Sequence, residues 1–239
     1  MFVTPAGIEV PAVTTAQMRE VDRIAIEDTG PNLFQMMENA GRNLAGLALE
    51  QLGDRWQTAT VVVLAGTGGN GGGGICAARH LANHGVAVKL CLAEPAGLGQ
   101  VPAFQYKVFQ STDGIELPRD RIADVRADLI LDALVGYSLG GAPRGAVAEL
   151  VGWANGSGAP IVSLDVPSGI DATTGEAPGI AIAPRATLTL ALPKLGLASR
   201  GGELVLADIG IPVAVYRRLS LRYLPPFGDR YRVTLRRSA

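Results

Sequence analysis

The sequence is poor in the residues that build metal clusters, disulfide scaffolds and nucleic-acid surfaces. It has only two cysteines and two histidines among 239 residues, and neither Cys76 nor Cys91 has the spacing of a zinc site or a disulfide framework. We therefore expect two buried thiols in a reducing compartment. A formal net charge of -1 excludes a strongly basic surface, so we expect no nucleic-acid partner.

Long apolar runs are missing as well. No stretch has the roughly 20 consecutive apolar residues that a membrane-spanning helix needs. The segment before Thr14 has neither the basic region nor the apolar region of a secretory signal. We therefore expect no membrane association and a cytoplasmic location.

The positions of the histidines disfavour two kinds of catalytic site. His80 and His84 lie four residues apart in an expected helix, but no third metal ligand follows them, so we expect packing or surface roles. Ser138 and Ser168 have no histidine beside them that would act as a base, which argues against a serine hydrolase.

Glycine, by contrast, is abundant, with 31 residues. The densest cluster lies between Gly66 and Gly74, after an apolar run that predicts a strand at 60–64 and before a predicted helix that begins at Ile75. Strand, glycine loop and helix form an arrangement typical of phosphate sites, because glycine lets the backbone approach an anion and the first helical N–H groups point at it. A flexible turn without a ligand is the alternative, and we favour the phosphate or nucleotide site.

The rest of the chain alternates between helical and strand-like patterns. We expect helices at 15–25, 33–52, 75–83, 101–110 and 146–155, and strands at 60–64, 86–92, 113–117, 128–134, 160–164, 186–190 and 203–207. This alternation predicts right-handed βαβ crossovers. The expected fold is one α/β domain over residues 1–239, a Rossmann-like three-layer sandwich with a mostly parallel central sheet and helices on both faces.

The end of the chain, 217–239, is rich in arginine. Such a segment suits either a patch for an anionic partner or a solvated, partly disordered tail, and we favour the tail.

Three unusual loops, at 66–74, 136–145 and 165–169, each follow an expected strand. Because ligands of parallel sheets bind beyond the carboxyl ends of the strands, we expect these loops to form one site. Asn70, Asp132 and Ser168 supply oxygen ligands there, which suit a hard, weakly held monovalent cation. Asp132 as a carboxylate that caps a loop is an equal alternative.

Asp165 ends the strand at 160–164, at the edge where we expect the cleft. A carboxylate in that position can act as a general acid or base, although it would also suit a brace for the turn that follows. Lys194 follows another strand and would neutralise a phosphate or pair with Asp165.

Several motifs, in this order and spacing, resemble the NAD(P)H-hydrate epimerase family over about residues 14–212. They are MMENAG (36–41), the glycine loop (66–74), DALVG (132–136), GAPRG (141–145), SLDVPSGIDATTG (163–175), PKLGL (193–197) and ADIGIP (207–212). The resemblance is to a stand-alone epimerase domain, an isomerase that interconverts the R and S forms of hydrated NADH and NADPH and so repairs these cofactors.

The resemblance also implies roles for particular residues. It implies a potassium ion bound by Asn70, Asp132 and Ser168, a catalytic and substrate-contacting role for Asp165, and a homodimer formed through the two N-terminal helices. The expected substrate-binding residues are Asn70, Gly71, Gly72, Gly136, Tyr137, Ser138, Leu139, Gly141, Asp165 and Lys194. In the implied mechanism, Asp165 protonates the departing hydroxyl, and water returns to the other face of the ring.

The glycine loop lacks two polar side chains of the family pattern, Gly-Pro-Gly-Asn-Asn-Gly-Gly-Asp-Gly. Gly69 replaces an asparagine and Gly73 replaces an aspartate, so an amide and a carboxylate are lost. A catalytically weakened or inactive nucleotide- or partner-binding domain is therefore the alternative function. An ordinary dinucleotide-dependent oxidoreductase is disfavoured, because only Glu94 would serve its ribose and the other loops would have no role.

Overall fold

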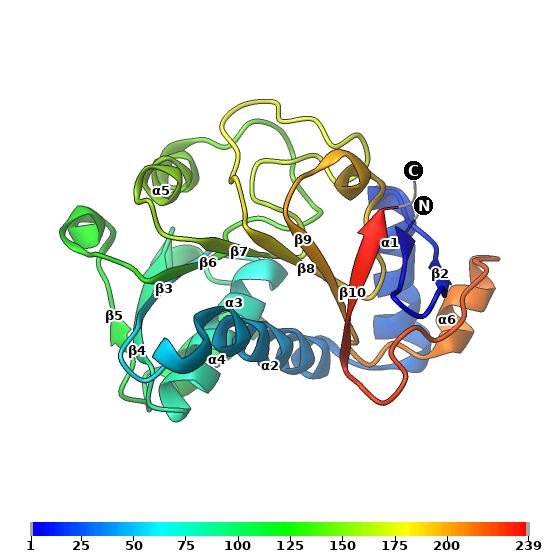
Figure 1. The fold of residues 1–239 in the computed structure, drawn as a ribbon, viewed down its shortest axis with the longest axis horizontal. Coiled ribbons are helices and arrows are strands. Elements are labelled where there is room, and N and C mark those ends of the chain that lie inside the picture. Colours follow the sequence, from blue (N-terminus) through cyan, green and yellow to red (C-terminus); the bar gives the residue numbers. More distant parts are fainter. Residues whose placement is uncertain (1, 238–239) are drawn as a thin grey trace.

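The computed structural model describes residues 2–237 and centres on one sheet of ten strands in the order β2-β1-β10-β9-β8-β7-β6-β3-β4-β5 (Figure 1). The strands are β1 (Phe2–Val3), β2 (Glu9–Val10), β3 (Thr60–Ala65), β4 (Ala87–Leu92), β5 (Ile115–Glu116), β6 (Leu129–Ala133), β7 (Ile161–Leu164), β8 (Ala186–Leu190), β9 (Glu203–Ala207) and β10 (Arg232–Arg237). From β9 to β5 all neighbours run parallel. The prediction of a mostly parallel sheet is confirmed.

The central strands are parallel because they are apolar on both faces. In β3 every residue from Val61 to Ala65 is buried, and β6 is buried along its whole length. Strands that are covered on both sides read as continuous apolar runs rather than as alternating patterns. This pairing brings the carboxyl ends of β3, β6, β7 and β8 to one edge of the sheet.

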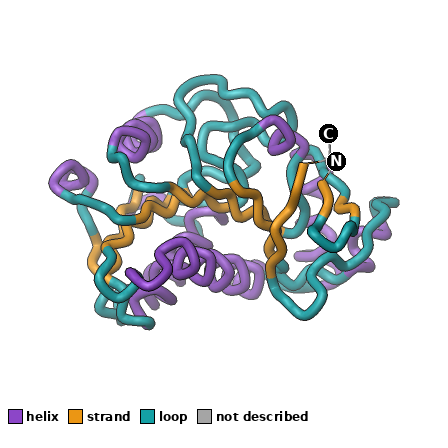
Figure 2. Tube along the Cα trace, viewed as in Figure 1, coloured by secondary structure: helices purple, strands orange, loops and turns teal. Residues whose placement is uncertain are grey.

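Helices cover both faces of the sheet, which makes three layers (Figure 2). The helices are α1 (Thr15–Ile24), α2 (Leu33–Leu52), α3 (Gly69–Asn83), α4 (Gln100–Phe109), α5 (Gly145–Gly156) and α6 (Val213–Arg218), with a π-helical turn at Ala25–Thr29 and 3-10 turns at Gly53–Arg55, Pro95–Gly97, Arg119–Asp124 and Leu195–Ser199. Helices α2, α3 and α4 lie on one face and α5 on the other, while α1 and α6 lie beside the antiparallel end (Figure 1). None of the helices within residues 2–237 is both long and apolar enough to cross a membrane.

The first two long helices begin where their side chains cap the backbone. The Thr14 side chain accepts a hydrogen bond from the backbone N–H of Gln17, and the Thr14 backbone N–H donates to the Gln17 side chain in return. Asn32 and Gln35 repeat this capping box at the start of α2. The predicted starts of both helices are confirmed.

The start of α3 differs from the prediction. The glycine cluster was expected to remain a loop up to Gly74, but the helix begins at Gly69. These glycines allow close packing instead: a Cβ at Gly71 would lie 1.8 Å from the Gly66 carbonyl oxygen, and one at Gly74 would lie 2.4 Å from the Ala133 Cβ. Tertiary packing of α3 on the sheet therefore overrides the low helix propensity of glycine.

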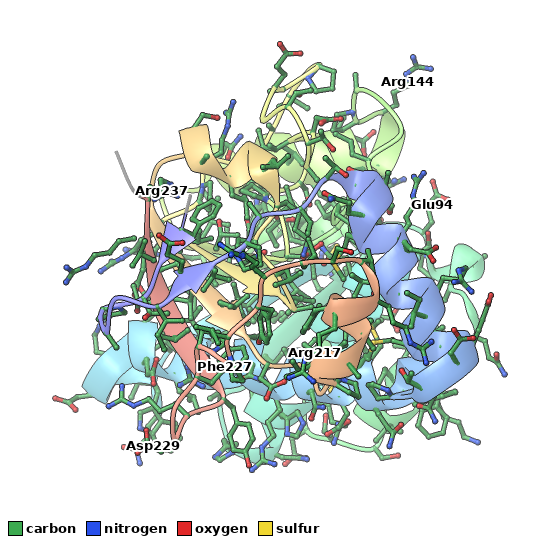
Figure 3. The ribbon with its side chains drawn as sticks, turned by 90° about the vertical axis from the view of Figure 1, so that its right-hand side faces the viewer. Glu94, Arg144, Arg217, Phe227, Asp229 and Arg237 are labelled. Atoms are coloured by element: carbon green, nitrogen blue, oxygen red, sulfur yellow. The ribbon has the colours of Figure 1, made fainter. Side chains whose placement is uncertain are left out.

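The prediction of a solvated C-terminal tail is wrong for the described residues. Helix α6 lies against α1, and β10 pairs antiparallel with β9 on one side and with β1 on the other. Figure 3 shows this segment, with Arg217, Phe227, Asp229 and Arg237 labelled along it. Arg237 donates hydrogen bonds to the carbonyls of Leu197 and Gly202, at 3.0 and 3.2 Å. Residues 238–239 lie outside the described part of the chain.

Candidate functional site

A cavity of about 340 Å³ opens at the carboxyl ends of the parallel strands. Its polar lining consists of Asp22, Asn70, Tyr137, Ser138, Asp165 and Lys194. Its apolar wall consists of Met18, Ile26, Leu33, Met36, Met37, Leu164, Leu190 and Ile209. An apolar cavity with a few convergent polar groups is the usual form of a small-molecule site. Ligands of open parallel sheets bind beyond the carboxyl ends of the strands, and this cavity lies there.

Asp165 is held in an unusual backbone conformation directly after β7. Its φ is 68°, in the left-handed region that aspartate adopts more readily than most side chains. The Asp165 N–H donates to the Leu188 carbonyl at 2.7 Å, which fixes the turn against β8. One carboxyl oxygen accepts the Tyr137 N–H at 3.0 Å and the other accepts a hydrogen bond from Lys194. The carboxyl group therefore stays at the cavity surface although the residue is only 4% exposed.

Lys194 is completely buried, and its position is fixed at both ends. Its backbone forms a parallel bridge with Val13. Its ammonium group donates to the Leu190 carbonyl at 2.9 Å, pairs with Asp165, and lies 5.8 Å from the centre of the Tyr137 ring. A buried ion pair of this kind is stable only when its remaining hydrogen bonds are satisfied, and the Leu190 carbonyl satisfies one of them.

Asp132 lies at the end of β6 and has no exposed surface. It accepts hydrogen bonds from the Ser163 hydroxyl at 2.7 Å, from the Ser168 hydroxyl and N–H at 2.5 and 2.9 Å, and from the Leu134 N–H at 3.3 Å. Burial raises the pKa of the Asp132 carboxyl, and these four hydrogen bonds oppose the rise. The loop-capping role considered for Asp132 is therefore present, because this carboxylate ties the loop after β6 to the loop after β7.

Asn70 stands out because neither polar atom of its buried amide has a hydrogen-bond partner among residues 2–237. The Asn70 amide and the Asp165 carboxyl group both lie against Gly136. A Cβ at Gly136 would lie 3.0 Å from Asp165 Oδ2 and 3.1 Å from Asn70 Oδ1. All three loops therefore meet at Gly136, as the sequence predicted. An unpaired buried amide costs free energy unless a ligand satisfies it, so the site favours an additional polar group.

The donor set fits a monovalent cation. Asn70 offers a free carbonyl oxygen, Ser168 a hydroxyl, and Asp132 a carboxylate whose hydrogen-bond donors are all uncharged groups. A hard cation prefers oxygen ligands of this kind, and a positive charge nearby would stabilise the ionised, fully buried Asp132.

Not all of the predicted substrate residues reach the cavity. Asn70, Gly136, Tyr137, Ser138, Asp165 and Lys194 line it. Gly71 and Gly72 are buried in the first turn of α3, whereas Leu139 and Gly141 line a separate shallow depression of the same loop. Their proposed contacts with the substrate stay predictions.

Sequence reasoning missed Asp22. It lies in α1, which received no chemical role, and its carboxyl accepts a hydrogen bond from the Tyr137 hydroxyl at 2.5 Å. The available signal was its spacing: Met18 and Asp22 are four residues apart, so both lie on one face of the helix, and both line the cavity.

At Gly73, where the family pattern has an aspartate, the space is already occupied. A Cβ there would lie 2.7 Å from Leu164 Cδ2, and Leu164 is a fully buried residue of the cavity wall. The lost carboxylate has thus been replaced by an apolar contact rather than by an open gap.

The structure brings two further groups to His80, for which the sequence indicated no third metal ligand. Glu38, Cys76 and His80 have ligand atoms within 4.8 Å of one another. Arg79, however, donates to Glu38 at 2.5 Å and lies 3.3 Å from the Cys76 sulfur, so an arginine already neutralises the carboxylate. We read this cluster as an ion-pair network between α2 and α3.

Comparisons with known proteins agree with this geometry. The profile of the family described as YjeF-related protein N-terminus matches residues 33–196. An NAD(P)H-hydrate epimerase of Dehalogenimonas lykanthroporepellens is 52% identical over 98% of this chain and 96% of the relative. An NAD(P)H-hydrate epimerase of Truepera radiovictrix is 36% identical over 87% of this chain and 94% of the relative.

Other relatives are longer or more distant. The chain is 36% identical to the bifunctional NAD(P)H-hydrate repair enzyme Nnr of Salinibacter ruber, of which it spans 42%. The crystal structure of the yeast protein ynu0 shares the fold, with a TM-score of 0.83 at 22% identity over 94% of this chain and 100% of the yeast chain. The chain therefore belongs to the NAD(P)H-hydrate epimerase family, whose domain is described as the YjeF-related protein N-terminus.

Proposed function

We propose that this protein is an isomerase that interconverts the R and S forms of hydrated NADH and NADPH. One observation carries the proposal: a buried carboxylate–ammonium pair, Asp165 and Lys194, faces a mostly apolar cavity at the carboxyl edge of a parallel sheet. The relatives that match nearly the whole length of this chain bear the name of this activity. The reaction belongs to nicotinamide nucleotide repair.

The substrate is held at two places. The backbone N–H groups at the start of α3 take the phosphates, because Gly68 supplies no side-chain cap and leaves them free for an anion. The hydrated nicotinamide ring lies in the cavity, against the apolar wall that includes Met18 and Leu190. Tyr137 and Ser138 line the rim of the same cavity.

Asp165 exchanges protons with the oxygen on the hydrated carbon. In water loss, the carbon–oxygen bond breaks, the oxygen leaves with a proton from a carboxyl group, and the ring nitrogen lone pair stabilises the resulting planar cation. Addition of water to the other face, with return of the proton to a carboxylate, gives the opposite configuration. Lys194 pairs with the Asp165 carboxyl group and holds it at the cavity.

Asn70, Asp132 and Ser168 would hold a potassium ion. When bound, the ion supplies positive charge beside the buried Asp132 carboxylate and satisfies the free Asn70 oxygen. These residues come from α3, from the end of β6 and from the loop after β7, so the ion would hold the segments around the cavity together.

The test is direct. The separated R and S forms of hydrated NADH and of hydrated NADPH are incubated with the protein in potassium or lithium buffer, and equilibration is followed by chromatography. We expect the wild type to equilibrate both substrates faster in potassium, and Asp165→Asn to lose about 10²- to 10⁴-fold in rate. Asp229→Asn, which alters a side chain that is 98% exposed, is the matched control. Unchanged equilibration by Asp165→Asn would refute the role of Asp165.

A non-catalytic nucleotide-binding domain is the second candidate, and the apolar contact at Gly73 favours it. Binding of the hydrated nucleotides without any turnover by the wild type would support this candidate and exclude the epimerase.

A cytoplasmic location and a homodimer stay predictions. The beginning of α2 leaves Leu33 and Phe34 39% and 36% exposed, and the Phe34 ring meets Phe104 of α4 edge to face, with ring centres 5.3 Å apart. We propose that this apolar surface contacts a second copy. Sedimentation of the wild type as a dimer and of Phe34→Glu as a monomer would support the contact.

A further inference from the structure

The cavity contains a second carboxyl group that the mechanism above does not use. Asp22 reaches it from α1. Tyr137 connects this group to the first one, because its hydroxyl donates to Asp22 at 2.5 Å while its backbone N–H donates to Asp165 at 3.0 Å. The two carboxyl groups are therefore held at opposite ends of one tyrosine, with the cavity beside both.

The charges around the two carboxyl groups are unequal. Lys194 pairs with Asp165, whereas the hydrogen-bond partner of Asp22 is an uncharged hydroxyl. One ammonium group facing two carboxyl groups in a largely buried space favours a state in which one carboxyl carries a proton. The groups that face Asp22 or its tyrosine partner are Tyr137, Lys194, Asp165, Tyr216 and Arg19.

The surroundings of Asp22 favour its protonated form more than water does. Burial raises the pKa of the Asp22 carboxyl, the hydrogen bond from Tyr137 and the charge of Lys194 lower it, and the charge of Asp165 raises it further, with a net rise. The pKa of the Tyr137 hydroxyl is raised by burial and by Asp22, so the tyrosine remains a hydrogen-bond donor.

Epimerisation at a planar cation needs a proton donor and a proton acceptor on different faces of the ring. Water leaves from one face and enters on the other, so a single carboxyl group on one face serves only half of each turnover. A protonated carboxyl and an ionised carboxyl at the two ends of one side chain supply both functions.

We propose that Asp22 is a second acid–base group of the epimerisation, acting on the ring face opposite to Asp165, with Tyr137 as its positioning residue. The inference rests on the proposed function. In one direction Asp22 gives its proton to the leaving hydroxyl as the carbon–oxygen bond breaks, and the bonding pair departs with the water formed. The entering water bonds to the carbon and gives its proton to Asp165. The reverse direction exchanges these roles, and proton exchange with solvent resets both groups.

The test compares Asp22→Asn, Tyr137→Phe and wild type in the chromatographic assay across pH. Glu20→Gln is the matched control, because Glu20 is an exposed carboxylate of the same helix. We expect Asp22→Asn to lower kcat by about 10²-fold or more with little change in KM, and Glu20→Gln to match the wild type. Thermal unfolding confirms that each variant is folded.

The pH profile separates proton transfer from positioning. Above the pKa of Asp22 the acid form is lost, so kcat of the wild type should fall on the alkaline side, and this fall should be absent in Asp22→Asn. Because the Tyr137 hydrogen bond lowers the pKa of Asp22, Tyr137→Phe should keep the alkaline fall and move it to higher pH.

Three results would overturn the inference. The first is a kcat of Asp22→Asn within twofold of the wild type. The second is a fall of kcat at alkaline pH that persists in Asp22→Asn. The third is a Tyr137→Phe variant that loses as much kcat as Asp22→Asn while the pH of the fall does not change. A wild type without turnover would remove the proposed function together with this inference, whereas an active wild type beside an unaffected Asp22→Asn would remove only the inference.

Discussion

Two buried aspartates of adjacent strands, Asp132 near the end of β6 and Asp165 directly after β7, have opposite surroundings. Asp132 is surrounded by uncharged donors, namely hydroxyl and amide groups of β7 and of the loops after β6 and β7. Asp165 has a fully buried lysine on one oxygen and a backbone amide on the other, and it faces a cavity. The residue type is the same and both residues lie at the carboxyl edge of the sheet, so the partners decide the role.

This difference indicates a structural role for Asp132 and a chemical role for Asp165. The donors around Asp132 come from β7 and from the loops after β6 and β7, and a carboxylate can hold these segments together because it has several acceptor sites. Asp165 has a charged partner and lines the cavity, so a bound ligand can reach its carboxyl group. The predictions below test this division, beginning with the largest expected effect.

Replacing Lys194 should have the largest effect. Lys194→Met leaves the Asp165 charge buried and unpaired, so we expect a loss of about 3–5 kcal/mol in the free energy of unfolding together with loss of epimerisation. Urea unfolding measures the first and the chromatographic assay the second. Lys107→Met, at an exposed position of α4, is the control.

A double variant sharpens this prediction. Lys194→Met combined with Asp165→Asn removes both charges, and asparagine tolerates the left-handed backbone of position 165, so the double variant should recover most of the stability but none of the activity. A Lys194→Met protein as stable as the wild type would contradict the ion pair.

Replacing Asp132 should cost less in stability. Asp132→Asn keeps the shape but loses acceptor capacity for the Ser163 and Ser168 hydroxyls, so the free energy of unfolding should fall by about 1–3 kcal/mol. If Asp132 also helps to bind potassium, the stabilisation that potassium gives the wild type should disappear in this variant. Equal unfolding midpoints for the wild type and Asp132→Asn, in potassium and in lithium buffer, would show that Asp132 holds neither the loops nor the ion.

The smallest effect is expected at Gly73. Alanine would improve helix propensity by up to about 1 kcal/mol, but its Cβ would meet Leu164, and overpacking costs about 1–3 kcal/mol. We expect a modest net loss that shrinks when Leu164→Val is added. A double-mutant cycle of unfolding free energies measures this coupling, and strict additivity would mean that the two side chains do not meet.

Local signals were sufficient for most of the parallel half of the fold. Apolar runs such as Val61 to Leu64 predicted buried strands, and helical spacing predicted the starts of α1 and α2, because strand burial and helix periodicity depend on neighbours along the chain. The sequence predicted Asn70, Asp132, Asp165 and Ser168 at or just beyond the carboxyl ends of strands, so sheet topology alone predicted that they would lie near one another.

The remaining features depend on contacts between distant segments. Strands β1 and β2 have two residues each, too few for a periodic pattern. The arginines of β10 hide its strand character, since only pairing with β9 and β1 makes Leu235 a buried residue. Asp22 looked like any polar residue of an amphipathic helix, and only the packing of α1 beside Tyr137 places it at the cavity.

The position of β10 between β9 and β1 means that β1 is linked to the parallel strands through a strand that follows all of them in the sequence. Phe2 pairs with Arg237 and also with Val10, so β1 and β2 join the sheet only after β10 has been synthesised and has paired. Until then β9 is an uncovered edge, open to pairing with another chain. The interval between translation of β9 and of β10 is therefore the period in which a growing chain is most exposed to misassembly.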